Sequence, residues 1–399
     1  MKSDLDKTQI LWRQVWGLSA LLAAILISFM AYGYYQPKIL RELGFGKLAA
    51  SLGIIQGLIG AALEPLVGLV SDRVFRQVGS RLPIISVGVT LAGLIFVVIA
   101  FCLEGNIPAG LRWLVPVLMT LWVMAMIIFR GPAIALLRQF APTEELPMAN
   151  GILILVLGLV GALGPPINLI LNYMGDSLTF IIGAIGLVLG ALALFTSTPK
   201  HTLVLPDFER YSFPSLQILG LIFLVGLGTG IEINLIMVII PPILQNQLGS
   251  GVVDLISSGI LLVSGVSGIV LGELTVRLGS SLGMMVGLGA IAILMGVTLL
   301  NHSPILALGL IIAFGIGLGL IFISQIPYSL GMMPPTLAGL GTGLYFGGMG
   351  GASALYSLLI KQSGGMTEVG AMLGIAIAFF FTAPALVLSK RIAPPSSGL

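Results

Sequence analysis

The chain has 399 residues, of which 57% are hydrophobic and only 8% are charged, and its mean hydropathy is +1.12. A soluble protein has about a quarter of its residues charged, so the composition excludes a soluble globular enzyme, and the high apolar fraction excludes a disordered chain. The formal net charge of +3 comes from basic residues spread among loops, not from the basic stripe of a nucleic-acid-binding protein, so we expect no nucleic-acid partner.

Apolar stretches of about 20 residues recur along the whole chain, and each is long enough to cross a bilayer as a helix. They are continuous and do not alternate with polar residues, which favours a helical bundle over a β-barrel. The predicted fold class is therefore an all-α membrane protein. Twelve spans are expected, at 12–34, 48–71, 82–103, 112–137, 147–172, 176–197, 215–243, 252–277, 281–301, 304–329, 336–361 and 367–389.

The longest polar interruption, 196–214, falls between the sixth and seventh spans. It divides the chain into two pseudo-symmetric six-helix bundles, 1–195 and 215–399, joined by a linker. With the N-terminus inside, twelve Lys and Arg residues fall on the cytoplasmic side and five on the other, as the positive-inside rule requires. We therefore expect both termini and the linker to be cytoplasmic, in a multi-pass protein of a prokaryotic inner membrane that lies in the lipid bilayer as a monomer.

A polar motif follows the second span, and a related loop joins the eighth and ninth. The first contains Gly68, Ser71, Asp72, Arg73, Gly79 and Arg81, and the second ends at Arg277. Two related loops at matching places indicate a duplicated six-helix unit. An Asp and an Arg in such a loop can pair with each other or cap a neighbouring helix. We predict that Asp72 and Arg73 stabilise an outward-facing state by tying the cytoplasmic ends of the two halves together.

These motifs resemble the major facilitator superfamily, whose loop after the second helix reads G-x-L-x-D-R-x-G-R-R. The expanded form here, P-L-V-G-x-x-S-D-R with a glycine seven residues beyond the Asp, is similar to the sucrose transporters of the glycoside–pentoside–hexuronide branch. Further stretches that resemble this branch are Gly131-Pro132, Ala149-Asn150 and Ile326-Pro327-Tyr328. The resemblance covers both halves and implies a transporter with a central cavity lined by helices one, four, seven and ten.

The chain departs from this branch at positions that bear on mechanism. Sucrose transporters carry an acidic residue, implicated in proton coupling, about two turns before the Gly-Pro pair, where this chain has Trp122, Val123 and Met124. Arg138 and Gln139 stand where the family has Ala-Asp. The resemblance therefore does not by itself imply proton-driven sugar transport.

Four ionisable residues lie at membrane depth, where a charge is costly and indicates a functional site: Glu64, Arg130, Glu232 and Glu273. Glu273 lies four residues before Arg277, which favours a structural ion pair at a helix end. Glu232 lies about 25 Å along the seventh span, beside Asn234. It lines a gate or cavity wall, or it is a hydrated residue at the outer edge of the membrane.

Glu64 and Arg130 lie at the same depth in the second and fourth spans. Each precedes the cytoplasmic end of its span by eight residues, or about 12 Å of helix. Either charge alone is expensive in lipid, so we predict a buried ion pair inside the N-terminal half. The pair is either a structural bridge or a coupling device, in which Glu64 takes up a proton and releases Arg130 to an anionic or hydroxylated ligand.

Polar side chains crowd the outer end of the first span, at Tyr32, Tyr35 and Gln36. Tyrosine favours the membrane interface on physical grounds, so these residues form either an aromatic belt or the wall of a ligand site. Gln325 and Tyr328 on the tenth span have the same two interpretations. The superfamily resemblance favours the ligand site, because its cavity is lined by helices one and ten.

The sequence favours a secondary transporter of a small solute, such as a sugar or another organic molecule, that works by alternating access. No nucleotide-binding loop supplies energy, so a gradient of protons or sodium drives transport, or transport is facilitated. We expect no enzyme activity, cofactor or metal, because the chain offers no nucleophile–base constellation and no cluster of histidines and cysteines. The alternative is the handling of an apolar cargo, a pigment or a lipid, which needs few polar contacts.

Overall fold

The computed structural model describes residues 9–105, 108–198, 213–361 and 367–392, and all the regular structure in these residues is helical. The helices of the first half are α1 (Trp12–Glu42), α2 (Gly46–Val78), α3 (Leu82–Glu104), η2 (Ala109–Leu111), α4 (Leu114–Ala135), α5 (Leu137–Phe140), α6 (Leu146–Ala162), α7 (Gly164–Met174) and α8 (Asp176–Ser197). Those of the second half are α9 (Leu216–Leu248), α10 (Val253–Leu278), α11 (Ser280–Leu299), α12 (Pro304–Gly331), η4 (Pro335–Leu337), α13 (Ala338–Tyr356), η5 (Ser357–Lys361) and α14 (Glu368–Ile392).

The predicted all-α membrane fold is confirmed. In the described chain, ten helical segments are long and apolar enough to cross a membrane, and the bent pair of α6 and α7 makes an eleventh. The glycine-rich α13 lies within the predicted span 336–361 and completes the twelve. Most of the predicted linker, 199–212, lies outside the described residues, and the bundle boundaries stay a prediction.

The predicted fifth span, 147–172, is not one straight helix. It is divided into α6 and α7, whose axes differ by 57°. Pro165 and Pro166 lie at the start of α7 and have no N–H, so the carbonyls of Gly161 and Ala162 cannot receive the usual intrahelical hydrogen bonds. The sequence carried this signal, because two consecutive prolines inside a span end or kink a helix.

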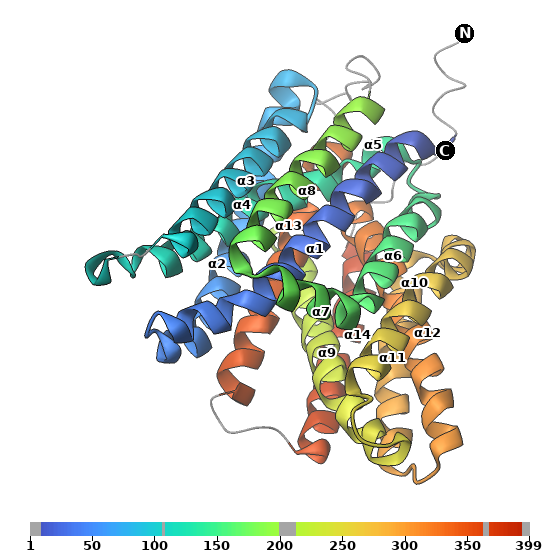
Figure 1. The fold of residues 1–399 in the computed structure, drawn as a ribbon. Coiled ribbons are helices and arrows are strands. Elements are labelled where there is room, and N and C mark those ends of the chain that lie inside the picture. The colour runs from blue at the N-terminus through green and yellow to red at the C-terminus, as the bar shows by residue number, and fades with distance from the viewer. Residues whose placement is uncertain (1–8, 106–107, 199–212, 362–366, 393–399) are drawn as a thin grey trace.

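The helices form two bundles that meet along their long sides (Figure 1). One apolar core consists almost entirely of residues from the first half, and a second core consists almost entirely of residues from the second half. The exceptions mark where the bundles touch: Ile326, Leu330 and Ala338 belong to the first core, and Ile154 belongs to the second.

Two helix pairs form most of the contact between the bundles, α2 with α13 and α6 with α10. Both pairs come close enough that glycine is required at the contact. A Cβ on Gly68 of α2 would collide with the carbonyl of Gly339 on α13, and a Cβ on Gly158 of α6 would collide with the backbone of Gly265 on α10. Small residues permit this approach in membranes, where dispersion contacts between helices replace the hydrophobic effect.

Gly158→Ala should therefore lower the midpoint of thermal unfolding in detergent, because overpacking a tight contact costs about 1–3 kcal/mol. Gly186→Ala in α8 is the matched control, since its new methyl group would meet nothing within 4 Å. That change should be neutral or stabilising by up to about 1 kcal/mol, because alanine favours a helix over glycine. Equal midpoints for the two variants would contradict the close contact between α6 and α10.

Candidate functional site

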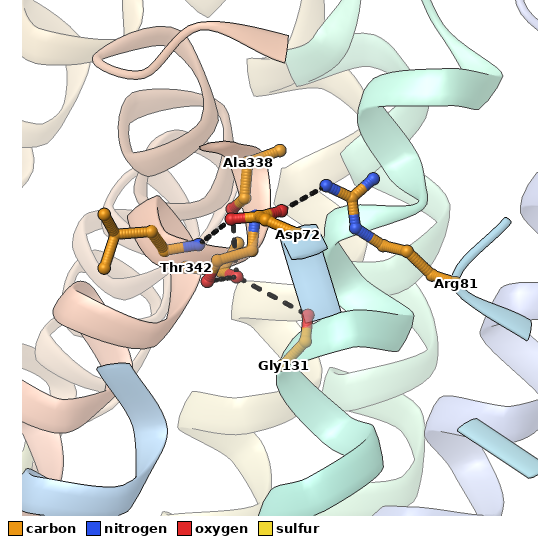
Figure 2. Close-up of polar contacts among 7 residues, drawn as sticks. Asp72, Arg81, Gly131, Ala338 and Thr342 are labelled. Carbon is orange, nitrogen blue, oxygen red and sulfur yellow. Dashed lines mark hydrogen bonds and ion pairs between the residues drawn. The ribbon is translucent and has the colours of Figure 1, made fainter. Parts of the chain in front are cut away.

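The carboxylate of Asp72 connects the two halves at the end of the molecule where α2 finishes and α13 begins, called here the Asp72 end. Its Oδ1 accepts hydrogen bonds from Arg81 at 2.5 Å and from the backbone N–H of Gly339 at 2.9 Å, and its Oδ2 accepts one from the N–H of Leu340 at 2.8 Å (Figure 2). Gly339 and Leu340 lie in the first turn of α13, which has no side-chain cap of its own. Asp72 therefore caps a helix of the other half, where its negative charge also meets the positive end of the helix dipole.

The partner of Asp72 is Arg81 and not Arg73. Both Asp72 and Arg81 are fully buried, and the guanidinium of Arg81 also lies 4.3 Å from the centre of the Phe75 ring. The side chain of Arg73 is exposed, so the prediction that it helps to tie the halves together is wrong. In the second half, Arg277 pairs with Glu273 at 2.6 Å on its own helix, as expected, and both side chains are largely exposed.

The other residues of the motif shape the backbone around Asp72. Gly79 has a φ of 74° and ends α2 in a left-handed conformation that favours glycine. Gly68 lets α2 contact Gly339 of α13. Ser71 is fully buried, and its hydroxyl has no hydrogen-bond partner among the described residues.

A second polar link joins the halves between α6 and α12. The Nδ2 of Asn150 donates to the carbonyls of Phe322 and Ile323, each at 3.0 Å. The carbonyl of Ile323 would normally accept the N–H four residues later, but that residue is Pro327, which has none. Asn150 therefore supplies a donor from one half to a carbonyl that the other half cannot satisfy.

The predicted ion pair between Glu64 of α2 and Arg130 of α4 is confirmed, because Arg130 donates directly to the Oε1 of Glu64. The two side chains differ in exposure, at 1% for Glu64 and 28% for Arg130. The Oε2 of Glu64 has no partner among the described residues. The ion pair thus consists of a buried carboxylate and a guanidinium that remains partly accessible.

Two aromatic rings from opposite halves flank this guanidinium. Its central carbon lies 5.8 Å from the ring centre of Phe29 on α1 and 5.3 Å from that of Phe346 on α13. Both distances are in the range of cation–π contacts. Since Phe346 belongs to the second half, Arg130 lies where the two bundles meet, which is where a transporter with two bundles binds its solute.

The polar residues toward the C-terminal end of α1 do not form an interfacial belt. Tyr32 and Tyr35 are buried, and the hydroxyl of Tyr35 donates to the carbonyl of Leu171. The hydroxyl of Tyr32 accepts from Gln56 of α2 at 2.6 Å, and Gln36 donates to the same Gln56 at 3.4 Å. Tyr35 is thus a core residue, whereas Tyr32, Gln36 and Gln56 form a partly buried amide network.

Glu232 of α9 lies inside the second bundle and not at a hydrated outer edge. It is fully buried, and neither carboxyl oxygen has a hydrogen-bond partner among the described residues. An unpaired carboxylate in such surroundings is very costly, so we expect the neutral form in this conformation. Asn234, two residues on, donates to the carbonyl of Gly230 at 2.7 Å and contacts Ser353 of α13 at 3.4 Å.

The two candidates on α12 are buried and hydrogen-bonded within the second half. Tyr328 donates to Ser389 of α14 at 3.0 Å, and Gln325 accepts from Tyr345 of α13 at 3.2 Å. Tyr345 directly precedes Phe346, whose ring contacts Arg130. Gln325 thus hydrogen-bonds to the sequence neighbour of Phe346 and not to Arg130 itself, whereas Tyr328 contributes to the packing of the second bundle.

The sequence interpretation missed four residues at these sites: Phe29, Gln56, Asn150 as a link between the halves, and Phe346. A signal existed for Gln56, an amide in an apolar span eight residues before Glu64 and therefore on the same side of α2. No pattern distinguishes Phe29 and Phe346 from other phenylalanines, because their role depends on how the bundles meet.

Removing one partner of the Glu64–Arg130 pair should destabilise the protein. Glu64→Gln should cost about 1–3 kcal/mol, since Arg130 keeps its charge but is partly hydrated, and Glu64→Gln with Arg130→Gln should recover much of the loss. Glu232→Gln is the matched control, another buried carboxyl at membrane depth but without a cation partner. It should change stability by less than about 0.5 kcal/mol.

A double-mutant cycle of thermal unfolding in detergent measures this coupling. If the effects of Glu64→Gln and Arg130→Gln simply add, the ion pair does not contribute. If Glu232→Gln destabilises as much as Glu64→Gln, the loss is a general property of buried carboxyls and not of the pair.

The described residues contain no group of three or more His, Cys, Asp or Glu side chains placed to hold a metal ion. The polar groups instead converge on Asp72 and on Arg130, both at contacts between the two bundles. Charged groups thus lie at the contact between the bundles in two places, near one end of the molecule and farther along α2 and α4.

Comparison with known proteins agrees with this architecture. The human organic anion transporter MFSD10 (TETRAN) superposes with a TM-score of 0.65 at 14% identity, covering 96% of this chain and 99% of its own. The proton:xylose symporter XylE, bound to 6-bromo-6-deoxy-D-glucose, gives a TM-score of 0.67 at 13% identity, covering 95% and 96%. By sequence, no curated protein matches the chain. The family model of the Major Facilitator Superfamily matches residues 18–357, and the chain therefore belongs to that superfamily.

Proposed function

We propose that the protein is a secondary transporter that carries a small organic solute by alternating access, with Arg130 as the group that binds it. The observation that carries this proposal is the position of Arg130, a partly exposed guanidinium at membrane depth between the two bundles. A charge at membrane depth is energetically costly, and such a residue therefore indicates a functional site. The fold supports the proposal, since the similar structures are described as an organic anion transporter and a proton:xylose symporter.

We infer that the solute carries an acidic group, and that this group replaces the carboxylate of Glu64 as the anionic partner of Arg130. With Glu64 ionised, the Glu64–Arg130 pair is neutral, and the empty protein can reorient without exposing a charge to lipid. When a proton neutralises Glu64, Arg130 is free to bind an anion, and the loaded site is neutral again. The scheme predicts symport of one proton with one anion.

The aromatic rings on either side of Arg130 add a preference for the body of the solute. Phe29 and Phe346 offer apolar faces from opposite halves. A ring of a sugar acid or of an aromatic acid can pack against such faces while its acidic group reaches the guanidinium. A neutral sugar is the next candidate, because Gln56 and Gln36 provide amide groups near Tyr32.

The alternative of an apolar cargo, such as a pigment or a lipid, is less compatible with this site. An apolar molecule between the bundles would remove water from Arg130 without replacing its hydrogen bonds, which costs free energy. Membership of the glycoside–pentoside–hexuronide branch stays a prediction that rests on the motifs around Asp72, Asn150 and Pro327.

We propose that the Asp72 end faces the cytoplasm, as the distribution of basic residues predicts, with both termini on that side and the protein acting as a monomer. Asp72 and Asn150 hold this end together. The proposed orientation would make the conformation described here one that is closed toward the cytoplasm.

The substrate class can be tested with pairs of compounds that differ only in an acidic group, such as glucuronate with glucose and benzoate with benzyl alcohol. At least one acid should raise the unfolding temperature of the purified protein more than its neutral partner does. Its affinity should increase about tenfold for each unit by which the pH falls, over the range where Glu64 is ionised in the empty protein, because one proton is bound with each anion.

Two variants separate the roles of the pair. Glu64→Gln should bind the acid with an affinity that no longer depends on pH, because the neutral Gln side chain mimics protonated Glu64. Arg130→Gln should bind the acid at least about tenfold more weakly. Binding that survives Arg130→Gln, or that favours the neutral partner in every pair, would contradict the proposed substrate class. Dependence on sodium instead of pH would exclude the proton as coupling ion.

Asp72→Asn should open the Asp72 end, because it removes the charge that holds Arg81 and the start of α13. Spin labels at Val78 and Leu278, exposed residues at the ends of α2 and α10, should report longer distances in this variant than in the parent. Arg73→Gln is the matched control at the neighbouring, exposed position, and it should leave the distances unchanged. Identical distance distributions in all three proteins would contradict a gating role for Asp72.

A further inference from the structure

A pocket of ≈ 240 Å³ lies between the first turns of α11 and the last turns of α14. Consecutive spans alternate in direction, so the start of α11 and the end of α14 lie at the same end of the molecule as Asp72. The pocket is away from the contact between the bundles, because the helix pairs that form most of that contact, α2 with α13 and α6 with α10, include neither α11 nor α14. It is thus separate from the Arg130 site.

One part of the pocket is cationic. Lys390 and Arg391, in the last turn of α14, line it together with Ser281 of α11. Both basic side chains are exposed, and none of the ion pairs found among the described residues includes either of them. Two exposed cations that form no ion pair with any described residue make this part of the pocket attractive to an anion.

The rest of the lining is apolar: Leu282 and Met285 of α11, and Leu386 and Val387 of α14. Leu386 and Val387 precede Lys390 and Arg391 by four residues each, which is about 6 Å along α14 toward the middle of the membrane. Leu386 is buried and Met285 is half-buried. Leu282 and Val387 are 36% and 42% exposed. Because α11 and α14 are membrane-spanning, these exposed apolar side chains meet lipid.

We propose that this pocket binds one anionic phospholipid, with its phosphate at Lys390 and Arg391 and the first methylene groups of its acyl chains on Leu282 and Val387. A dissolved anion would use the cations but not the apolar wall, and a zwitterionic lipid would bring a positive group to the two cations. Basic pockets between spanning helices are known to suit anionic lipid headgroups. The proposal is independent of the solute that the protein transports.

Native mass spectrometry of the full-length protein in detergent tests the proposal, with phosphatidylglycerol and phosphatidylcholine of identical acyl chains as probes. The parent should retain one phosphatidylglycerol in preference to phosphatidylcholine. Lys390→Gln with Arg391→Gln should weaken that binding about tenfold or more, which corresponds to about 1.4 kcal/mol. Arg73→Gln with Arg76→Gln is the matched control, since it removes two exposed cations at the same end of the molecule but outside the pocket.

A second variant leaves the charges in place and fills the space. Ser281→Trp should also weaken the binding of phosphatidylglycerol, whereas a purely electrostatic attraction to the surface would survive it. Equal loss of lipid in the pocket variant and in the Arg73/Arg76 control would overturn the proposal. So would displacement of the lipid by millimolar inorganic phosphate, because the site would then recognise a dissolved anion and not a phospholipid.

Discussion

The carboxylate of Asp72 satisfies groups from both halves of the chain at once. Arg81 comes from its own half, and the N–H groups of Gly339 and Leu340 come from the other. These groups are buried, and a buried polar group that is left without a partner costs about 1–3 kcal/mol, or more when it is charged. The two bundles can therefore separate at this end only if water reaches the same groups.

The same helix that Asp72 caps also reaches the proposed solute site at Arg130. Gly339 and Phe346 are seven residues apart on α13, or about 10 Å along its axis. Gly339 of α13 packs against Gly68 and donates to Asp72, and Gly343 packs against the backbone of Glu64. Helix α13 therefore contacts both residues of α2 to which a function is proposed, Asp72 and Glu64. A shift of α13 against α2 changes the cap and the aromatic contact with Arg130 together. A rigid helix that contacts both places provides a physical connection between the proposed gate and the proposed site.

The sequence predicted well those features that follow from the depth of a residue along its helix or from a short sequence motif. The Glu64–Arg130 pair followed from counting residues back from the ends of two spans, because a helix converts sequence separation into depth. The capping role of Asp72 followed from a motif in a short loop. The sequence was wrong about Arg73, because α2 continues to Val78 and includes Arg73, whose side chain is exposed, while the turn at Gly79 brings Arg81 back to Asp72.

What it could not predict depended on the angle around each helix and on how the bundles meet. From the sequence, Tyr32 and Tyr35 could belong to an interfacial aromatic belt or to a cavity wall, and in the structure both are buried. Phe346 faces Arg130 because α13 lies against the first half, a contact between residues more than 200 positions apart. Periodicity within one span carries no information about such a contact.

Pro327 leaves the carbonyl of Ile323 without a donor from its own helix, and Asn150 of the other half fills that place. When the halves part, α12 has no internal means of satisfying this carbonyl, so at least one water molecule must enter and stay. Opening of this end therefore requires the hydration of this backbone oxygen. Solutes that are excluded from protein surfaces and withdraw water, such as sucrose, should accordingly hold the end closed, which makes the balance between conformations sensitive to the osmolarity of the medium.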